Sequence, residues 1–189
     1  MDEKHYISAQ ELLNDSFQLG IRVFKSGFRP SFIVGIWRGG TPVGIAVQEI
    51  LDQLGITTDH IAIRTSSYFG IGQRTKTVRV HGLEYVIRHA NWGDGLLIVD
   101  DVFDSGNSIK AVIETLEKKM RRNLPQDIRI ATPWYKPGNN ETDIVPHYYL
   151  NATEQWLVFP HELEGLTQEE IFANKPGMRE MYQKAGLTK

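Results

Sequence analysis

A short apolar segment that ends on two adjacent carboxylates is the feature that most constrains this fold. Leu96–Val99 is entirely apolar, and Asp100 and Asp101 follow it directly. An all-apolar run of this length is typical of a strand covered on both faces, as in a parallel sheet. Apolar residues then recur with helical spacing in Ile109–Met120, so that strand, turn and helix form one crossover unit. The sequence therefore predicts two carboxylates at the carboxyl end of a parallel strand, where sheets of this kind bind ligands.

The same order of strand, turn and helix repeats along the chain. The expected strands are Phe32–Ile36, His60–Arg64, Leu96–Val99, Ile128–Thr132 and Trp156–Phe159, with ribbon strands at Thr77–Val80 and Tyr85–Ile87. Capping-box pairs open two of the expected helices, and an N-cap followed by proline opens a third. The capping-box pairs are Ser8 with Glu11 and Thr167 with Glu170, and the third signal is Thr41 with Pro42. Gly27 ends the helix that starts near Ser8, and Gly55 ends the helix that starts near Thr41. The polar segment Thr65–Arg74 is expected to be a mobile loop. This pattern predicts an α/β fold with a central parallel sheet flanked by helices.

Composition excludes several classes of function. The chain of 189 residues has no cysteine, which excludes thiol catalysis, thiolate metal sites and disulfides. With 21 basic and 23 acidic side chains the net charge is −2, which argues against a general nucleic-acid binder. The first residues, Met1–His5, are polar, and no apolar run reaches the roughly 18 residues that a membrane span needs. We therefore expect a soluble, cytoplasmic protein with no membrane partner.

The residues after the acidic pair offer a phosphate site. Asp104–Ser108 contains a glycine turn, two hydroxyl groups and backbone donors at the start of a helix, which suit a phosphate dianion. Neighbouring side chains of an extended backbone point in opposite directions, so Asp100 and Asp101 can bind a ligand at two points, such as vicinal hydroxyls or a hydrated cation. Together these features describe a ribose 5-phosphate site. The alternative is that the two carboxylates are surface charges and that Ser108 is an ordinary helix cap.

The stretch Leu96–Ser108 resembles the phosphoribosyl-diphosphate signature of type I phosphoribosyltransferases. The segment Trp37–Gly40 is similar to the pyrophosphate loop of that family, in which a cis peptide bond precedes the residue that matches Arg38. Gly39 and Gly40 would allow close approach of the backbone, and Arg38 would supply positive charge for diphosphate.

Three further segments resemble the 6-oxopurine branch of the family. Ser67-Tyr68 is similar to the Ser-Tyr pair of its lid loop, although a plain hairpin tip is an alternative. Lys136 follows a strand where these enzymes place a lysine that donates to the 6-oxo group, and a solvated lysine is the alternative. Trp156 matches the aromatic residue that stacks on the base, with Leu157 and Glu162 in the segment that reads its edge. Core packing is the alternative for the tryptophan.

The resemblance implies a function and a role for each residue. The enzyme would transfer the phosphoribosyl group from phosphoribosyl diphosphate to hypoxanthine, guanine or xanthine, and it would give the nucleoside monophosphate and diphosphate. Asp104 would be the general base that faces nitrogen 7 of the purine. The residues implied to bind phosphoribosyl diphosphate are Arg38, Gly39, Gly40, Ser67, Tyr68, Asp100, Asp101, Ser105, Gly106, Asn107 and Ser108. Mg²⁺ is the implied cofactor, with Asp101 and Glu162 near it.

The resemblance also implies an organisation for the chain. Residues 1–189 would form one phosphoribosyltransferase domain, with a core over about 28–162 and a hood built from the N-terminal segment and the C-terminal part. A homo-oligomer, either a dimer or a tetramer, is expected. Relatives often have Glu-Asp at the acidic pair, Asp where Glu162 stands, and Gly or Lys where Asn107 stands. These differences leave the preferred purine open.

Two alternatives keep the same fold. One is a regulator that senses phosphoribosyl diphosphate and binds RNA, which would require a coherent basic face. The densest basic cluster, Lys118, Lys119, Arg121 and Arg122, stands at the end of an expected helix, where it complements the helix dipole. The other is a transferase for another base, such as a pyrimidine, which Asp104, Lys136 and Trp156 argue against. A dinucleotide-dependent dehydrogenase is excluded because its Gly-x-Gly-x-x-Gly turn is missing.

Overall fold

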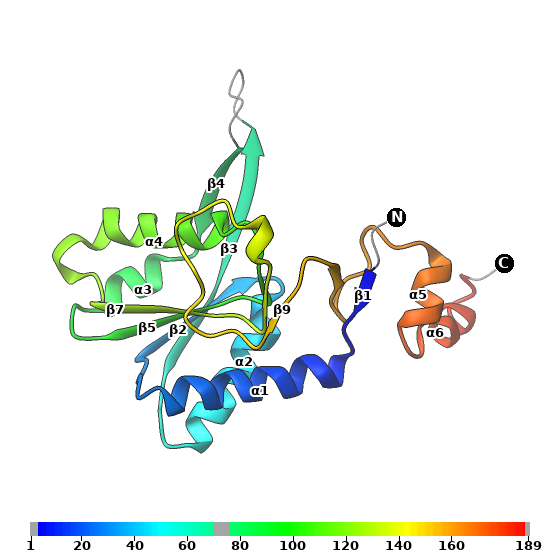
Figure 1. The fold of residues 1–189 in the computed structure, drawn as a ribbon, viewed down its shortest axis with the longest axis horizontal. Coiled ribbons are helices and arrows are strands. Elements are labelled where there is room, and N and C mark those ends of the chain that lie inside the picture. Colours follow the sequence, from blue (N-terminus) through cyan, green and yellow to red (C-terminus); the bar gives the residue numbers. More distant parts are fainter. Residues whose placement is uncertain (1–3, 70–75, 188–189) are drawn as a thin grey trace. The chain divides into compact units, whose positions relative to one another are not determined.

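The computed structural model describes residues 4–69 and 76–187 (Figure 1). The chain divides into two compact units. The larger unit spans Leu13–Glu154, and the smaller one combines Met1–Leu12 with Gln155–Lys189.

A five-stranded sheet forms the centre of the larger unit, in the order β4-β3-β2-β5-β7. Its strands are β2 (Phe32–Trp37), β3 (Asp59–Phe69), β4 (Lys76–His81), β5 (Gly95–Val99) and β7 (Asp127–Ala131). All neighbouring strands are parallel except β4, which pairs antiparallel with β3. This arrangement confirms the predicted α/β fold with its central, mostly parallel sheet.

Helices cover both faces of this sheet (Figure 1). They are α1 (Ala9–Lys25), α2 (Gly40–Gln53), α3 (Glu84–His89) and α4 (Asn107–Met120), and a 3₁₀ turn, η1 (Arg121–Asn123), follows α4. Every residue of β5 is buried, as the all-apolar run predicted, and Ile109, Val112 and Leu116 of α4 pack into the same core. Burying these three side chains of α4 stabilises the domain by several kcal/mol, at about 1.5–3 kcal/mol each. The carboxyl end of β5 is therefore anchored firmly.

A second, small sheet joins two segments that the site uses. It contains β6 (Val102–Phe103), β8 (Trp134–Tyr135) and β9 (Asn151–Ala152), all parallel. In its register Phe103 lies opposite Tyr135, and the Lys136 amide donates to the Phe103 carbonyl at 2.9 Å. The next residues along the two strands, Asp104 and Lys136, are thereby brought side by side. A one-turn 3₁₀ helix, η2 (Pro137–Asn139), follows directly.

The smaller unit pairs the two ends of the chain. Strand β1 (Lys4–Tyr6) runs parallel to β10 (Trp156–Val158), and two helices follow, α5 (Gln168–Asn174) and α6 (Met178–Lys184). Both predicted capping boxes are present. The Glu11 amide donates to Ser8 Oγ, and Thr167 with Glu170 makes the same reciprocal pair at the start of α5.

Three local expectations are wrong. The first part of the expected loop, through Phe69, belongs to β3, because β4 supplies an antiparallel partner that local sequence cannot reveal. The rest of that loop, Gly70–Arg74, lies outside the described residues. Tyr85–Ile87 is helical within α3 rather than a ribbon strand, because Val86 is drawn into the core. Helix α2 begins at Gly40 with Gly39 as its cap, so Thr41 is not the cap.

None of the helices in the described part of the chain is long and apolar enough to cross a lipid bilayer.

Candidate active site

The glycine loop after β2 lies against the acidic pair after β5. The two strands are neighbours in the sheet, with Gly35 opposite Val99, so their carboxyl ends meet. The peptide bond between Trp37 and Arg38 is cis. A side chain at Gly39 would overlap the carboxylate of Asp101, and one at Gly40 would press on the backbone of Val99 and Asp100. Glycine is therefore required at both positions so that the loop can reach the acidic pair.

The two carboxylates of this pair occupy a buried setting. Asp101 is 8% exposed, Asp100 is half-buried, and the Asp101 amide donates to Asp100 Oδ1 at 3.0 Å. Burial, together with the negative charge of Asp101, raises the pKa of Asp100 well above its ordinary value. The alternative in which both residues are solvated surface charges does not hold. Two buried neighbouring carboxyls disfavour each other's ionisation, so the site favours a partner that donates hydrogen bonds or carries positive charge.

A cavity of about 200 Å³ opens beside the acidic pair. The residues that line it are Asp100, Asp101, Val102, Phe103, Asp104, Ser105, Gly106, Ser108 and Ile109. Gly106 has a positive φ of 77° and is the residue that caps α4, so Ser108 is not the cap. Ser105 Oγ accepts from the Asn107 amide at 3.4 Å, and Thr65 of β3 donates to Ser108 Oγ at 3.4 Å. Hydroxyl groups and the amino end of a 14-residue helix thus meet at one cavity, which suits an anion.

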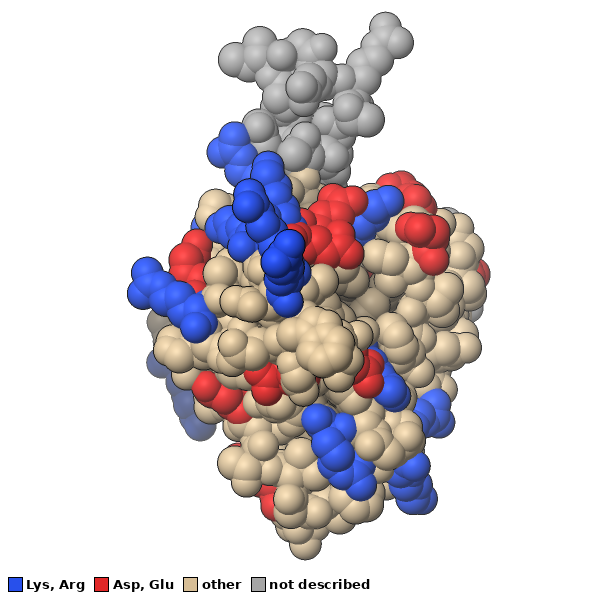
Figure 2. Space-filling view, turned by 90° about the vertical axis from the view of Figure 1, so that its left-hand side faces the viewer, with Lys and Arg blue, Asp and Glu red and all other residues tan. Residues whose placement is uncertain are grey.

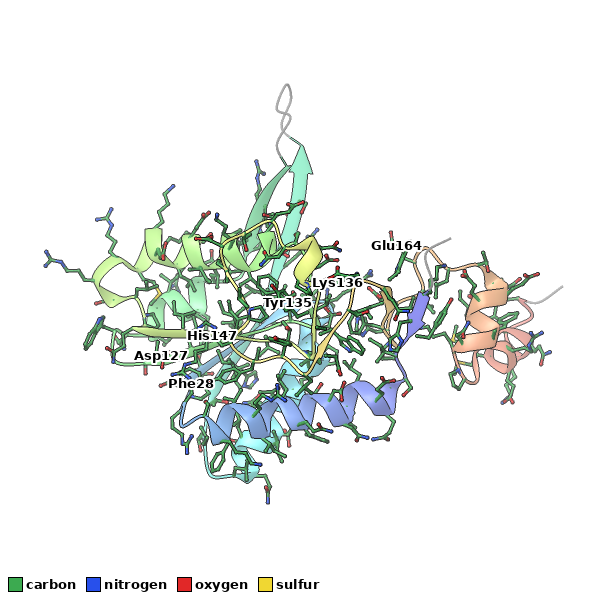
Figure 3. The ribbon with its side chains drawn as sticks, viewed as in Figure 1. Phe28, Asp127, Tyr135, Lys136, His147 and Glu164 are labelled. Carbon is green, nitrogen blue, oxygen red and sulfur yellow. The ribbon has the colours of Figure 1, made fainter. Side chains whose placement is uncertain are left out.

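Two side chains of the segment after β8 hold the carboxylate of Asp104. Lys136 Nζ lies 3.5 Å from Asp104 Oδ2, and Asn139 Nδ2 donates to Asp104 Oδ1 at 2.8 Å. The lysine side chain is only 11% exposed, whereas that of Asp104 is 47% exposed (Lys136 is labelled in Figure 3). The alternative of a solvated lysine therefore does not hold. A buried cation and a half-open carboxylate stand together at the edge of the predicted phosphate turn.

The remaining predicted residues of the larger unit lie on its loop and hairpin. Arg38 is exposed, and Asn107, the first residue of α4, donates to Glu141 Oε2 at 2.5 Å. Ser67 is exposed on β3 opposite Val78, and the backbone of Tyr68 pairs with that of Thr77. The Ser-Tyr pair thus belongs to a strand rather than to the tip of a hairpin.

The predicted base-stacking segment lies in the smaller unit. The Trp156 side chain is 51% exposed at the start of β10, and Lys4 Nζ stands 5.4 Å from its ring. It is therefore not a core residue, whereas Leu157 is buried. Glu162 folds back so that its Oε2 accepts from the Phe159 amide at 3.1 Å. Within this unit the segment therefore carries a half-exposed aromatic ring with a lysine over it.

Sequence reasoning missed Asn139 and Thr65, both of which contact predicted site residues. Asn139 lies three residues after Lys136 in Lys-Pro-Gly-Asn, a turn sequence that could have placed both side chains on one loop. Nothing local marks Thr65, because its contact with Ser108 depends on the long extension of β3.

Comparison with known proteins decides the family. A sequence model described as "Phosphoribosyl transferase domain" matches residues 9–163. This chain belongs to the phosphoribosyltransferase family. The matched range includes the glycine loop, the acidic pair and the predicted base-stacking segment that begins at Trp156, and α5 and α6 lie beyond it.

Relatives of the phosphoribosyltransferase are similar to it in sequence or in fold. The chain is 27% identical over 179 residues to a hypoxanthine-guanine phosphoribosyltransferase of Lactococcus lactis, covering 92% of this chain and 88% of that protein. Among solved structures it resembles a purine phosphoribosyltransferase of Pyrococcus horikoshii with 27% identity and a TM-score of 0.67, over 89% of this chain and 99% of the other. A xanthine-guanine-hypoxanthine phosphoribosyltransferase of Helicobacter pylori shares the fold with 22% identity and a TM-score of 0.65, over 83% and 92% of the two chains.

Proposed function

We propose that this phosphoribosyltransferase transfers the 5-phosphoribosyl group from phosphoribosyl diphosphate to a 6-oxopurine, as the names of its relatives suggest. The observation that carries the proposal is the contact of Asp104 with Lys136 beside the cavity of the acidic pair. A purine whose nitrogen 7 faces a carboxylate and whose 6-oxo group faces a cation would meet both groups on one edge.

The sugar phosphate would occupy the cavity after β5. Ser105, Gly106, Asn107 and Ser108 would hold the 5-phosphate at the start of α4, and Asp100 and Asp101 would accept from the ribose hydroxyls. Arg38, with the backbone of Gly39 and Gly40, would bind the leaving diphosphate. Ser67 and Tyr68 would cover the reactants from the β3–β4 hairpin and exclude water.

The purine would bind against groups of opposite chemical character. Asp104 would take the proton from nitrogen 7 as the other imidazole nitrogen bonds to the sugar, and Lys136 would stabilise negative charge on the 6-oxo group. Trp156 would stack on the ring, and Leu157 and Glu162 would contact its edge. Holding both reactants in this geometry is the main source of rate enhancement in a reaction of this kind.

The residues present fit Mg²⁺ only in company with substrate. The described residues contain no cluster of three or more His, Asp or Glu side chains that could hold a metal alone. Mg²⁺ in nucleotide sites is commonly held by one or two carboxylates plus phosphate oxygens, and the buried pair Asp100-Asp101 supplies such carboxylates. Bound there with Asp101 near it, Mg²⁺ would neutralise charge on the diphosphate. Glu162 is a second proposed contact for the metal.

The wider organisation remains part of this proposal. We take the chain as one phosphoribosyltransferase domain with a core over about 28–162 and a hood built from the N-terminal segment and the C-terminal part, working as a homo-oligomer in the cytoplasm. RNA binding is not proposed. Figure 2 shows acidic side chains interspersed among the basic ones on one face, and Lys119 lies 3.8 Å from Glu84.

A steady-state assay tests the proposal. Purified protein with Mg²⁺ and phosphoribosyl diphosphate is given hypoxanthine, guanine, xanthine, adenine and uracil in turn, and nucleotide formation is followed. Turnover with at least one 6-oxopurine and little with uracil is expected. Turnover with none of the 6-oxopurines would overturn the assignment.

A further inference from the structure

We propose that Asn139 is a positioning residue that holds Asp104 in the orientation needed for proton transfer. This inference rests on the proposed function, because it concerns how that function's general base is held. The Nδ2 group of Asn139 donates to Asp104 Oδ1 at 2.8 Å, and Lys136 stands 3.5 Å from the other oxygen. The two contacts hold the carboxylate from both of its oxygens.

One short turn delivers both partners to Asp104. Lys136 precedes η2, Asn139 ends it, and the Asn139 amide donates to the Lys136 carbonyl at 3.2 Å. The start of the turn is fixed because the Lys136 amide donates to the Phe103 carbonyl, one residue before Asp104. The spacing between lysine and asparagine is therefore set by the backbone, and the turn is tied to the strand that carries the carboxylate.

The middle of the turn is held as well. The Gly138 amide donates to Glu154 Oε1 at 2.9 Å, and a side chain at Gly138 would collide with the carboxylate of Glu154. Asn139 therefore starts from a fixed backbone and needs little ordering to reach Asp104. Such pre-ordering is what allows one neutral hydrogen bond to restrict a half-exposed side chain.

The role follows from the freedom that Asp104 would otherwise have. With 47% of its side chain exposed, Asp104 could turn towards solvent or fold its carboxylate fully onto the lysine. A general base must lie within hydrogen-bond reach of the proton that it takes, and small displacements can lower rates by up to about a hundredfold. Asn139 restrains one oxygen of the Asp104 carboxylate and so limits how far this carboxylate can rotate away from the purine.

The test is a double-mutant cycle with Asp104. Asn139→Ala should lower kcat about tenfold while the KM for phosphoribosyl diphosphate stays within twofold, since that substrate is held elsewhere. In an Asp104→Ala background the same substitution should change kcat less than twofold, because no carboxylate remains to be oriented. Asn139→Asp keeps the shape without the N–H donor, so it should lower kcat at least as far as Asn139→Ala. Asn139→Gln keeps the donor and should restore part of the loss.

Asn140→Ala is the matched control. Asn140 Nδ2 donates to the Ile144 carbonyl at 2.8 Å and its Oδ1 accepts from the Thr142 amide at 2.9 Å, so it braces the same loop without a contact to Asp104. It should lower the melting temperature and change kcat by the same factor in both backgrounds.

The outcomes separate the two proposals. If the wild type is active and Asn139→Ala leaves kcat unchanged, or lowers it equally in the Asp104→Ala background, Asn139 has no positioning role and the proposed function stands. If the wild type forms no nucleotide with any 6-oxopurine, the proposed function fails and this inference fails with it.

Discussion

Two carboxylates of this protein, Asp100 after β5 and Glu170 in the first turn of α5, lie in opposite environments. Burial and the charge of Asp101 raise the pKa of Asp100 well above its ordinary value. The hydrogen bond from Lys4, followed by that from the Thr167 amide, lowers the pKa of Glu170 from 4.5 to about 2. The first carboxylate accepts from the Asp101 amide but lies beside a second negative charge, whereas the second accepts from both a lysine and the backbone amide of the helix cap.

The difference separates a site that awaits a ligand from one that serves the fold. A carboxylate with a raised folded-state pKa weakens folding at neutral pH, whereas one with a lowered pKa strengthens it. Carboxylates that lie beside a like charge in a cavity are typical of binding sites, where stability is lowered in favour of function. Substitutions in the region after β5 should therefore affect activity first, and substitutions at α5 should affect stability first.

The largest expected effect is on turnover. Asp104→Asn removes the proposed base with little change in shape, so it should lower kcat by about 10² or more, the usual range for general acid–base groups. Steady-state kinetics measure the change, and circular dichroism checks that the variant is folded. A folded variant with unchanged turnover would remove Asp104 from this role and weaken the contrast between the two regions.

The next effect tests the close approach of the glycine loop. Gly39→Ala would place a methyl group against the Asp101 carboxylate, and such overpacking typically costs about 1–3 kcal/mol. We expect the KM for phosphoribosyl diphosphate to rise about tenfold or more. Gly93→Ala is the matched control, because a side chain there would meet no atom within 4 Å. Equal kinetics for the two variants would contradict the assigned role of the loop.

Asp100→Asn should separate stability from binding. Removing one of two neighbouring negative charges should raise the melting temperature of the metal-free protein by about 3 °C at neutral pH, for a gain of about 1 kcal/mol. The same change should weaken binding of phosphoribosyl diphosphate with Mg²⁺ about tenfold, because a charged acceptor is lost. Calorimetry measures both quantities. A less stable variant would show that the hydrogen bonds of Asp100 outweigh its repulsion from Asp101.

The smallest effects are expected at the start of α5. Thr167→Ala removes the cap and should destabilise this helix by about 1 kcal/mol, with kcat within twofold of the wild type. Hydrogen exchange of the α5 amides measures the loss locally.

Glu170→Gln adds a dependence on pH. Because folding lowers the pKa of Glu170, its stabilising contribution is complete above 4.5 and is lost as the pH falls through about 2. The difference in α5 protection between the wild type and the variant should therefore shrink over that range. A difference that does not change with pH would mean that the Lys4 contact has no electrostatic effect on stability.

Local sequence was enough to predict the buried strands, both capping boxes and the turn after β5. Each of these depends on residues close together in the chain: the run Leu96–Val99, the pairs Ser8-Glu11 and Thr167-Glu170, and the glycine at 106. The prediction that Asp104 and Lys136 lie in one site came from the family resemblance and not from local sequence.

Only the tertiary structure decided the rest. The extension of β3 depends on pairing with β4, β1 depends on β10 more than 140 residues away, and α3 forms where a strand was expected. Asn139 reaches Asp104 because β6 and β8 pair in one particular register. Hydrogen bonds and charges between distant segments leave no periodic pattern in the local sequence. The sequence alone therefore determines which chemical groups follow β5, whereas the folded structure determines which side chains orient those groups.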